Sequence, residues 1–483
     1  MSGTPPDRVR LTTRERLILL VLLGAGFMFA VDFSILNVAL PDVAAGVGLR
    51  RTALPWVTTA YMLPAAGFTL VFGRLADLVG RRRLFLGGTA LLMAASLLGG
   101  FATAPGPLLA ARVLQGFATA MATPAALSLL TSTFAEGAAR DRALGLNGAL
   151  LSGGFTVGAL VGGSLVSLLS WRAAFFINVP VAVLILATAP ALLVEGPRPG
   201  RVRLDLPGAV AVTGGLLTAT YAVIEKNWIS GAAAAVLLAA FLALERRAPA
   251  PLVPLPVLRR PTVAWGNLGG LVAFTMEPAM IFLLTLYLQG TLHLSPLATG
   301  FVFGVPGLAS IGAGVLAGRF IGRHGARRVL TAGLAVQGLA TLPLLLVGTS
   351  RPTALAILIP ALFVGFFGHV SAIVAYTVTG TSGLPDAEQG LATGLTLLTQ
   401  QVAVTSGIPI LSAVAATRSG ELAGTHLALA VDVTVTLVGA ALIYRGLRPR
   451  TPATPASPAP PAGSAIAEPP AFMKPSAQPA TLA

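Results

Sequence analysis

Two acids and one arginine inside long apolar segments of the chain could do ion chemistry. Asp32 lies in the run 17–41, Arg112 in the run 108–133 and Glu277 in the run 262–288. About 20 apolar residues cross the ~30 Å hydrocarbon core of a bilayer. A charge near the middle of such a segment costs about 3 kcal/mol, so by default it marks the path of an ion or a substrate. These residue types therefore predict binding of a proton or another ion. The alternative is that the Asp32 carboxylate lies at the membrane surface. An Asp side chain is, however, too short to reach that surface from this depth of the segment.

Asp32 and Arg112 are expected to form a pair. A buried Arg needs a carboxylate or carbonyl partner, and the two residues lie at similar depths of their segments. Gln115 lies three residues after Arg112 on the same helix face, where it can hydrogen bond to the pair. The affinity of Asp32 for a proton would then depend on whether water reaches it, which is the logic of proton coupling. The alternative is a solvated Arg112 near the membrane surface.

A charged segment after the second apolar run predicts a conformational latch. It contains the residues Gly73, Arg74, Asp77, Gly80 and Arg81. We expect a tight glycine-rich turn between two helices, in which an Asp among arginines forms ion pairs in only one arrangement of the helices. An ordinary positively charged loop would explain the arginines, but not the spacing of glycine and Asp.

The same segment occurs twice, which predicts two related halves. Residues 73–83 align without gaps with residues 318–328, and Gly322 replaces Asp77 in the second copy. Transporters built from two repeats bind substrate near the midplane between them.

The alignment also pairs Asp32 with Glu277. Each acid lies about fifteen residues from the start of its apolar run, roughly 22 Å from the cytoplasmic face at 1.5 Å per residue. We therefore expect both acids to face one central cavity from opposite halves. The alternative is a chance match, with Glu277 marking a kink at Pro278.

The composition predicts an all-α polytopic membrane protein. Hydrophobic residues make up 55% of the 483 residues and charged residues 10%, against about 25% charged residues in soluble domains. Fourteen apolar runs are expected as membrane spans, at 17–41, 53–73, 84–104, 108–133, 142–169, 173–194, 206–225, 229–244, 262–288, 297–318, 328–348, 353–377, 389–416 and 426–444. Alternate loops then carry 25 Lys and Arg against 6 in the others, which predicts both termini in the cytoplasm. The net charge of +15 thus sets orientation and does not indicate nucleic acid.

Two further features concern packing and a possible extra acid. Gly154, Gly158 and Gly162 repeat at four-residue spacing, which lets a neighbouring helix approach closely. Asp432 is embedded in the last span near its outer end, where it is either functional or interfacial. The chain has no cysteine and four scattered His, so we expect no thiol chemistry, no metal, no cofactor and no enzymatic activity.

The motifs together resemble the major facilitator superfamily, in particular its fourteen-helix drug:proton antiporter family. The resemblance covers about residues 14–445 and is carried by 32–41 (DFSILNVALP), 73–83 (GRLADLVGRRR), 112–116 (RVLQG), 154–163 (GFTVGALVGG), 171–180 (WRAAFFINVP), 286–289 (LYLQ) with 295–296 (SP), and 390–394 (GLATG) with 400–401 (QQ). Two departures stand out. The family's antiporter helix has Pro where this chain has Ala159, and the thirteenth span lacks the acid that some multidrug members carry there.

The resemblance implies two six-helix bundles with two inserted helices. The expected parts are a cytoplasmic N-terminus at 1–16, an N-terminal bundle at 17–194, the insert at 195–261, a C-terminal bundle at 262–445 and a disordered Pro- and Ala-rich tail at 446–483. It implies export of small amphipathic compounds in exchange for protons at the plasma membrane of a bacterium, by a monomer in the lipid bilayer. Export of one natural product and proton-coupled uptake of a metabolite are the alternatives.

The resemblance also assigns roles to individual residues. It implies proton coupling or substrate binding for Asp32 and Arg112. The internal repeat adds Glu277 to the expected coupling residues, and we expect Asn37, Gln115 and Gln289 to bind substrate. The segment around Asp77 is expected to hold the outward-open state.

Overall fold

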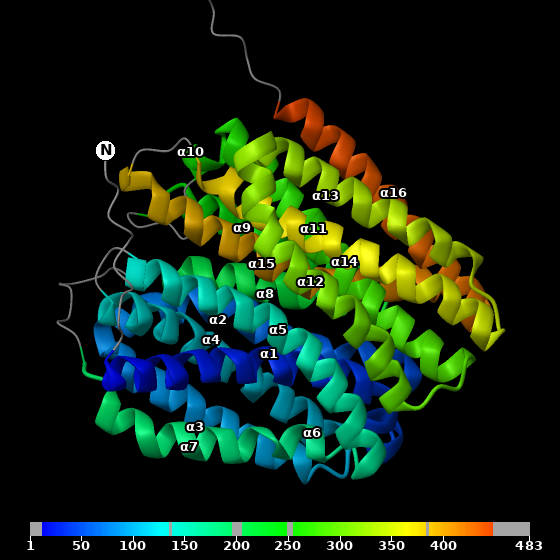
Figure 1. The fold of residues 1–483 in the computed structure, drawn as a ribbon, viewed down its shortest axis with the longest axis horizontal. Helices are drawn as coiled ribbons and strands as arrows, with labels where there is room; N and C mark the ends of the chain where they lie inside the picture. The colour runs from blue at the N-terminus through cyan, green and yellow to red at the C-terminus, as the bar shows by residue number, and fades with distance from the viewer. Residues whose placement is uncertain (1–11, 135–137, 196–204, 249–254, 383–385, 448–483) are drawn as a thin grey trace, which may run out of the picture. The chain divides into compact units, whose positions relative to one another are not determined.

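The computed structural model describes residues 12–134, 138–195, 205–248, 255–382 and 386–447. The chain divides into Met1–Leu447 and Arg448–Ala483, and the expected tail lies outside the described residues apart from its first two positions. Figure 1 shows that the described part is built of helices running side by side. In its first half these are α1 Thr13–Val47, α2 Leu54–Val79, α3 Arg81–Gly100, α4 Pro105–Thr133, α5 Ala138–Leu168, α6 Ala173–Phe176 and α7 Asn178–Leu192.

The rest of the chain continues in the same way. After α8 Leu206–Ile224 and α9 Trp228–Glu245 come α10 Leu255–Leu258, α11 Pro261–Leu286, α12 Pro296–His324, α13 Ala326–Thr341, α14 Arg351–Thr381, α15 Asp386–Ala415 and α16 Glu421–Gly446. Short helices occupy Arg51–Ala53, Tyr287–Thr291 (η2, a π-helical turn) and Leu342–Leu346. Among the described residues, twelve helices are long and apolar enough to cross a membrane, and Thr156–Leu168 adds a shorter apolar segment.

Helix α1 is longer at both ends than the expected run 17–41. It begins after Thr12, whose side chain accepts a hydrogen bond from the backbone of Glu15 in a capping box, an arrangement that satisfies two free N–H groups. It continues through Pro41 and ends at Gly48, which adopts a left-handed conformation with φ 70°. The helix therefore runs about two turns beyond the expected apolar run, to a glycine that ends it.

The expected turn at 73–83 is almost entirely helical. Helix α2 extends to Val79 and α3 begins at Arg81, so Gly80 alone joins them, with φ 114° and ψ 130°. Gly325 joins α12 and α13 in the same way, with φ 83° and ψ 148°. The two glycines correspond in the sequence repeat, and only glycine adopts such angles readily. The repeat is therefore present in the backbone.

Helix packing follows the same two-fold pattern. A side chain at Gly88 would meet the backbone of Ala118 and Ala122 on α4. A side chain at Gly333, its counterpart on α13, would meet the backbone of Gly368 and Ala372 on α14. The close approach of α3 to α4 is thus repeated by α13 and α14.

Gly154, Gly158 and Gly162 bring α5 against α1, within the same half of the chain. A Cβ at Gly158 would lie 2.9 Å from the Val31 carbonyl oxygen, and one at Gly162 would lie 2.9 Å from that of Ile35. The glycine spacing thus produces close helix packing without the proline that stands at Ala159 in the family.

The two halves meet along α5–α12 and α2–α15. Contact is close where α5 ends and α12 begins: a Cβ at Gly163 would lie 2.4 Å from the Pro296 carbonyl oxygen, and the Leu297 N–H donates to Ser167 Oγ at 3.0 Å. A buried apolar cluster from both halves fills the same end, including Leu40 and Phe282. In this structure the halves are therefore sealed together at the end away from Gly80 and Gly325.

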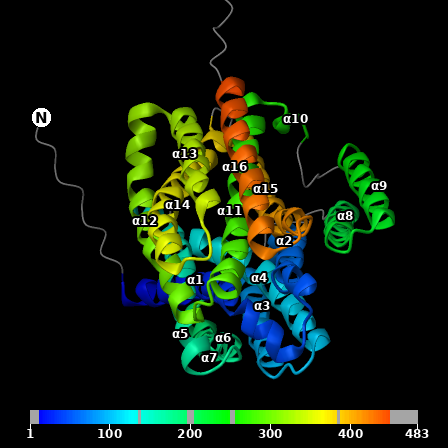
Figure 2. The same ribbon diagram turned by 90° about the vertical axis from the view of Figure 1, so that its right-hand side faces the viewer.

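The inserted helices α8 and α9 form a separate hairpin-like pair beside α2 and α15, at one side of the described helices (Figure 2). A Cβ at Gly67 of α2 would lie 2.3 Å from Thr213 Oγ1 of α8. Trp228 and Val236 of α9 are among the most exposed large apolar residues, as expected for side chains that face lipid.

The glycine contact between α3 and α4 can be tested with neighbouring positions. Gly88→Ala places a Cβ 2.9 Å from backbone atoms, whereas a Cβ at Gly87 meets only the Met121 methyl group at 3.5 Å. We expect Gly88→Ala to lower stability by about 1–3 kcal/mol, the usual cost of overpacking, and Gly87→Ala to be neutral or stabilising. Thermal denaturation midpoints of detergent-purified protein measure both. Equal midpoints for the two variants would contradict the close approach.

Candidate functional site

Asp32 is the centre of a buried network in the N-terminal half. It is 0% exposed and accepts hydrogen bonds from three side chains on two other helices. Arg112 Nη1 lies 3.4 Å from Oδ2, Gln115 Nε2 lies 3.1 Å from Oδ1, and Asn178 Nδ2 also donates to Oδ1. The pairing of Asp32 with Arg112 and Gln115 thus appears in the structure.

Arg112 is fixed by more than the carboxylate. Its Nε donates to the Val57 carbonyl of α2 at 3.0 Å, and its Nη1 donates to Gln115 Oε1 at 2.7 Å. The guanidinium lies 4.4 Å from the ring centroid of Tyr61, which adds a cation–π contact. An Arg at 1% exposure is therefore surrounded by partners, and it is not at the membrane surface.

The sequence analysis did not predict the polar residues that surround the group of Asp32, Arg112 and Gln115. Ser96 Oγ of α3 accepts hydrogen bonds from Gln115 Nε2 at 3.0 Å and Asn178 Nδ2 at 3.1 Å, and the Tyr61 hydroxyl bonds to Thr119. Asn178 lies within the motif 171–180, so its place in a family signature was the available signal. Its Oδ1 has no hydrogen-bond partner among the described residues, which leaves an acceptor for water or a protonated group.

Glu277 lies in a second buried cluster, in the C-terminal half. Its Oε2 is 3.5 Å from His369 Nε2 of α14, and His369 Nδ1 is 3.3 Å from Gln337 Oε1 of α13. Asp432 of α16 is near enough to interact electrostatically with Glu277. It accepts a hydrogen bond from Thr436 through Oδ1, while Oδ2 has no hydrogen-bond partner among the described residues.

Asp32 and Glu277 lie in two separate polar clusters in this structure, and a central cavity that both acids face stays a prediction. The partners of Asp32 lie on α4 and α7, and those of Glu277 lie on α14 and α16. Each carboxylate thus points into its own half, because the donors and polar groups that offset its burial are there. Asp432 is 1% exposed and interacts with Glu277, so its side chain is enclosed by the protein in this structure.

Two of the predicted substrate-binding residues are buried, and the third is half-buried where the two halves meet. Asn37 is 5% exposed on α1, and Gln115 belongs to the Asp32 network. Gln289 of η2 donates through Nε2 to the Val38 carbonyl at 2.8 Å, which links the two halves. Contact of Gln289 with a substrate would require this bond to open.

The predicted latch is described only in part. Gly73 lies inside α2, and the side chains of Arg74 and Asp77 lie outside the described residues. At the start of α3 the Arg82 N–H donates to Glu195 Oε1 at 3.3 Å. A carboxylate is favourable at a helix N-terminus because of the helix dipole.

Arg82 and its repeat counterpart act alike on the last helix of each half. Arg82 Nη2 donates to the Pro190 carbonyl of α7, and Arg327 Nη2 donates to the Tyr444 carbonyl of α16, both at 2.7 Å. The arginines of the segment therefore bind helix C-terminal ends, in addition to setting orientation. Arg81 makes interactions as well.

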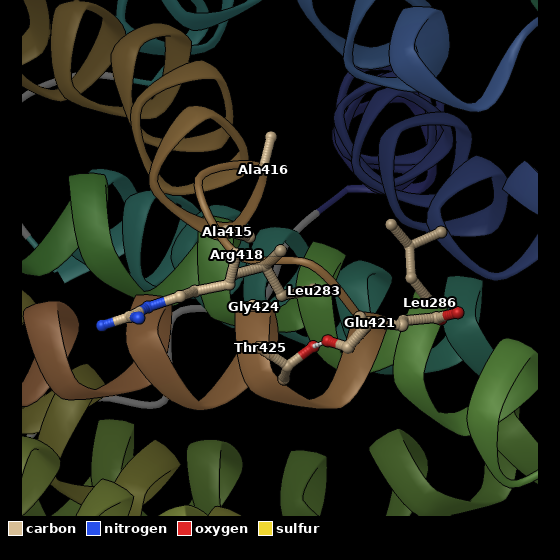
Figure 3. Close-up of a pocket in the computed structure, with 9 residues that line it drawn as sticks. Leu283, Leu286, Ala415, Ala416, Arg418, Glu421, Gly424 and Thr425 are labelled. Atoms are coloured by element: carbon tan, nitrogen blue, oxygen red, sulfur yellow. Dashed lines mark hydrogen bonds between the residues drawn. The ribbon is translucent and has the colours of Figure 1, made fainter.

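A cavity of about 250 Å³ lies between α11 and the turn joining α15 to α16 (Figure 3). Leu283, Gly420 and Glu421 line it, and the side chains of Arg418 and Glu421 point in opposite directions in the view. None of the predicted coupling or substrate residues lines this cavity. Among the described residues, no three His, Cys, Asp or Glu side chains are placed to hold a metal ion.

The pairing inside the membrane can be tested by removing one charge. Arg112→Ala leaves Asp32 buried beside fewer donors, so we expect a loss of about 3–5 kcal/mol. Arg172→Ala removes a partly buried Arg that lies over Trp171 and should cost less than half as much. Denaturation midpoints in detergent compare the two. The double variant Asp32→Asn/Arg112→Gln should recover part of the loss; no recovery would indicate that the charge pair is not the cause.

Comparison with known proteins agrees with the fold and adds relatives. The cephamycin export protein CmcT of Amycolatopsis lactamdurans is 37% identical over 91% of this chain and 93% of its own length. The puromycin resistance protein pur8 of Streptomyces alboniger is 36% identical over 90% of this chain and 91% of its own. The multidrug resistance protein Stp of Mycobacterium tuberculosis (strain CDC 1551 / Oshkosh) is 31% identical over 90% and 83%.

A solved structure has the same fold. The human organic anion transporter MFSD10 (TETRAN) superposes with a TM-score of 0.59 over 90% of this chain and 100% of its own, at 17% identity. The sequence from residue 22 to residue 408 matches the Major Facilitator Superfamily. With a twice-repeated helix pattern, apolar helices long enough to span a bilayer and this match, the chain is a multi-pass membrane protein that belongs to the Major Facilitator Superfamily.

Proposed function

We propose that the protein is an antiporter that exports small amphipathic compounds, such as drugs or antibiotics, in exchange for protons. The buried network of Asp32, Arg112, Gln115 and Asn178 carries the proposal. The relatives of this chain that are named for export or resistance support the direction of transport. They favour export over uptake of a metabolite. Two of these relatives are named for single compounds, cephamycin and puromycin, so a dedicated exporter of one natural product is the second candidate.

Asp32 suits proton coupling because its environment is finely balanced. Removing a carboxylate from water disfavours its charged form, while an opposite charge and three donors favour it. Water entering from one side would change that balance, and so would movement of α4 or α7 relative to α1. A group whose proton affinity changes with conformation can bind a proton on one side of the membrane and release it on the other.

Glu277 is proposed as the second proton-binding group, with His369 as a positioning residue. The imidazole of His369 lies between Glu277 and Gln337 and can hold the carboxyl group in one orientation. Asp432 is a candidate third acid in the same cluster.

The conformation supports an alternating-access cycle. The halves are joined at one end by Gln289 with Val38 and by Leu297 with Ser167. We propose that this end faces the cell exterior, so that both acids are closed to the outside in this state. Release of these contacts would open the outer side, and the segment with Gly73, Arg74, Asp77, Gly80 and Arg81 would then hold the halves together at the inner side.

The topology is proposed to contain fourteen spans. Helices α2 and α5 are 26 and 31 residues long and would add to the twelve apolar helices. An even number places both termini in the cytoplasm, consistent with the arginines at Gly80 and Gly325. The domain boundaries expected from the sequence remain those at 194, 261 and 445, with the protein acting as a monomer.

The proton gradient is sufficient for such export. One proton entering down ~100 mV releases about 2.3 kcal/mol, and one pH unit adds about 1.4 kcal/mol. Together these support a concentration ratio of a neutral compound of several hundred-fold per proton.

Proton flux in proteoliposomes tests the coupling residues. With an inward-directed pH gradient, addition of an amphipathic cation should trigger proton flux through the wild type. The same flux through Asp32→Asn should be at least tenfold lower. The buried Glu277→Gln should show the same loss, whereas Glu225→Gln, an exposed acid bonded to Trp56, should behave as wild type. A proton flux through Asp32→Asn equal to that of the wild type would contradict the proposed role of Asp32.

His369 is tested through the pH profile of exchange. His369→Gln removes the imidazole beside Glu277, so we expect exchange to slow and its pH optimum to move by at least half a unit. His426→Gln is the matched control, because His426 bonds only to the Val347 carbonyl in the described residues. A uniform loss of rate with an unchanged pH profile would indicate a merely structural role.

A further inference from the structure

A groove of about 290 Å³ opens between α12, α13 and α14, outside both acid clusters. Its walls are mainly apolar and are formed by Phe320, Val329, Ala332, Val336, Phe367 and Ser371. Gly333 and Gly368 lie at the floor, where their lack of side chains lets α13 and α14 cross closely. Ala332 is exposed, so the groove faces the surroundings of the helices.

One end of the groove is basic. Arg328 and His324 line it where α12 ends and α13 begins. Both residues are exposed. The Arg328 carbonyl accepts a hydrogen bond from the Thr331 hydroxyl, but its guanidinium makes no hydrogen bond or ion pair with the described residues. In a groove that is otherwise apolar, this cation is free to bind an anion at the helix end.

A second polar group lies inside the groove. Ser371 is 5% exposed, and its Oγ has no hydrogen-bond partner among the described residues. A buried hydroxyl without a partner costs free energy unless a bound molecule supplies one. An oxygen acceptor within an otherwise apolar ligand would satisfy it.

The length of the groove matches a lipid leaflet. Arg328 and Val336 are eight residues apart on α13, about 12 Å at 1.5 Å per residue, and half of the hydrocarbon core is about 15 Å. The basic end lies at the same side as the arginine-rich segments that set orientation, which is the cytoplasmic side. Anionic lipids in that leaflet attract such basic residues.

We propose that this groove binds an anionic phospholipid of the cytoplasmic leaflet. Its phosphate is held at Arg328, with His324 beside it, and an ester carbonyl accepts the hydrogen bond of Ser371. One acyl chain follows Val329, Ala332 and Val336. The site lies in the C-terminal half alone and does not depend on proton coupling.

Native mass spectrometry of the full chain in detergent tests this site. The probes are a phosphatidylglycerol and a phosphatidylcholine with identical acyl chains, and inorganic phosphate alone. We expect wild-type protein to retain phosphatidylglycerol preferentially. Arg328→Ala should weaken that binding about five-fold, the usual contribution of one basic residue near a membrane surface. Ala332→Phe fills the groove without changing charge and should weaken binding of both lipids.

Arg323→Ala is the matched control, because Arg323 is exposed at the same helix end but does not line the groove. The Arg323→Ala variant should bind phosphatidylglycerol like the wild type. If Ala332→Phe elutes abnormally in size-exclusion chromatography, Ala332→Leu replaces it. Equal weakening by Arg323→Ala and Arg328→Ala, or unaltered binding in both Ala332 variants, would overturn the proposal. The proposal would also be overturned if inorganic phosphate alone reproduced the effect of phosphatidylglycerol. It would likewise be overturned if the wild type were a dimer that Ala332→Phe dissociates.

Discussion

The burial of Asp32 with Arg112 is the constraint on which the N-terminal half depends. Two opposite charges at 0% and 1% exposure are tolerated only when each finds partners in excellent geometry. Helices α2, α3, α4 and α7 supply those partners, so the network fixes how five helices including α1 stand to one another. The same requirement makes the site responsive, since any shift of one helix changes what the carboxylate contacts.

The two halves solve the problem of a buried acid differently. By the shared packing of the Gly88 and Gly333 crossings, Arg112 corresponds to Leu362 and Thr119 corresponds to His369. Among the described residues, no Arg or Lys pairs with Glu277, and the second half has instead a titratable imidazole about two turns further along the helix. A fixed cation and an imidazole give the two acids different dependences on the surrounding pH.

Much of the fold was predictable from the sequence, because long apolar runs and alternating basic loops have few explanations. The Asp32–Arg112 pair was also predictable, since a buried charge needs a partner. The direction of each acid was not, because it depends on which neighbouring helix supplies donors such as Asn178 or His369. The apolar run 17–41 also did not predict the full length of α1, because the helix continues through Pro41, and a proline inside a long helix is tolerated when neighbouring helices support it.

The inserted pair α8–α9 makes the molecule unequal on its two sides. Helix α8 packs on both α2 and α15, so it bridges one of the two seams between the halves, while the α5–α12 seam has no such cover among the described helices. A rocking motion must therefore slide α8 over at least one neighbour. The inserted pair thus shields one seam from the bilayer, and hydrocarbon chains meet the uncovered α5–α12 seam more directly.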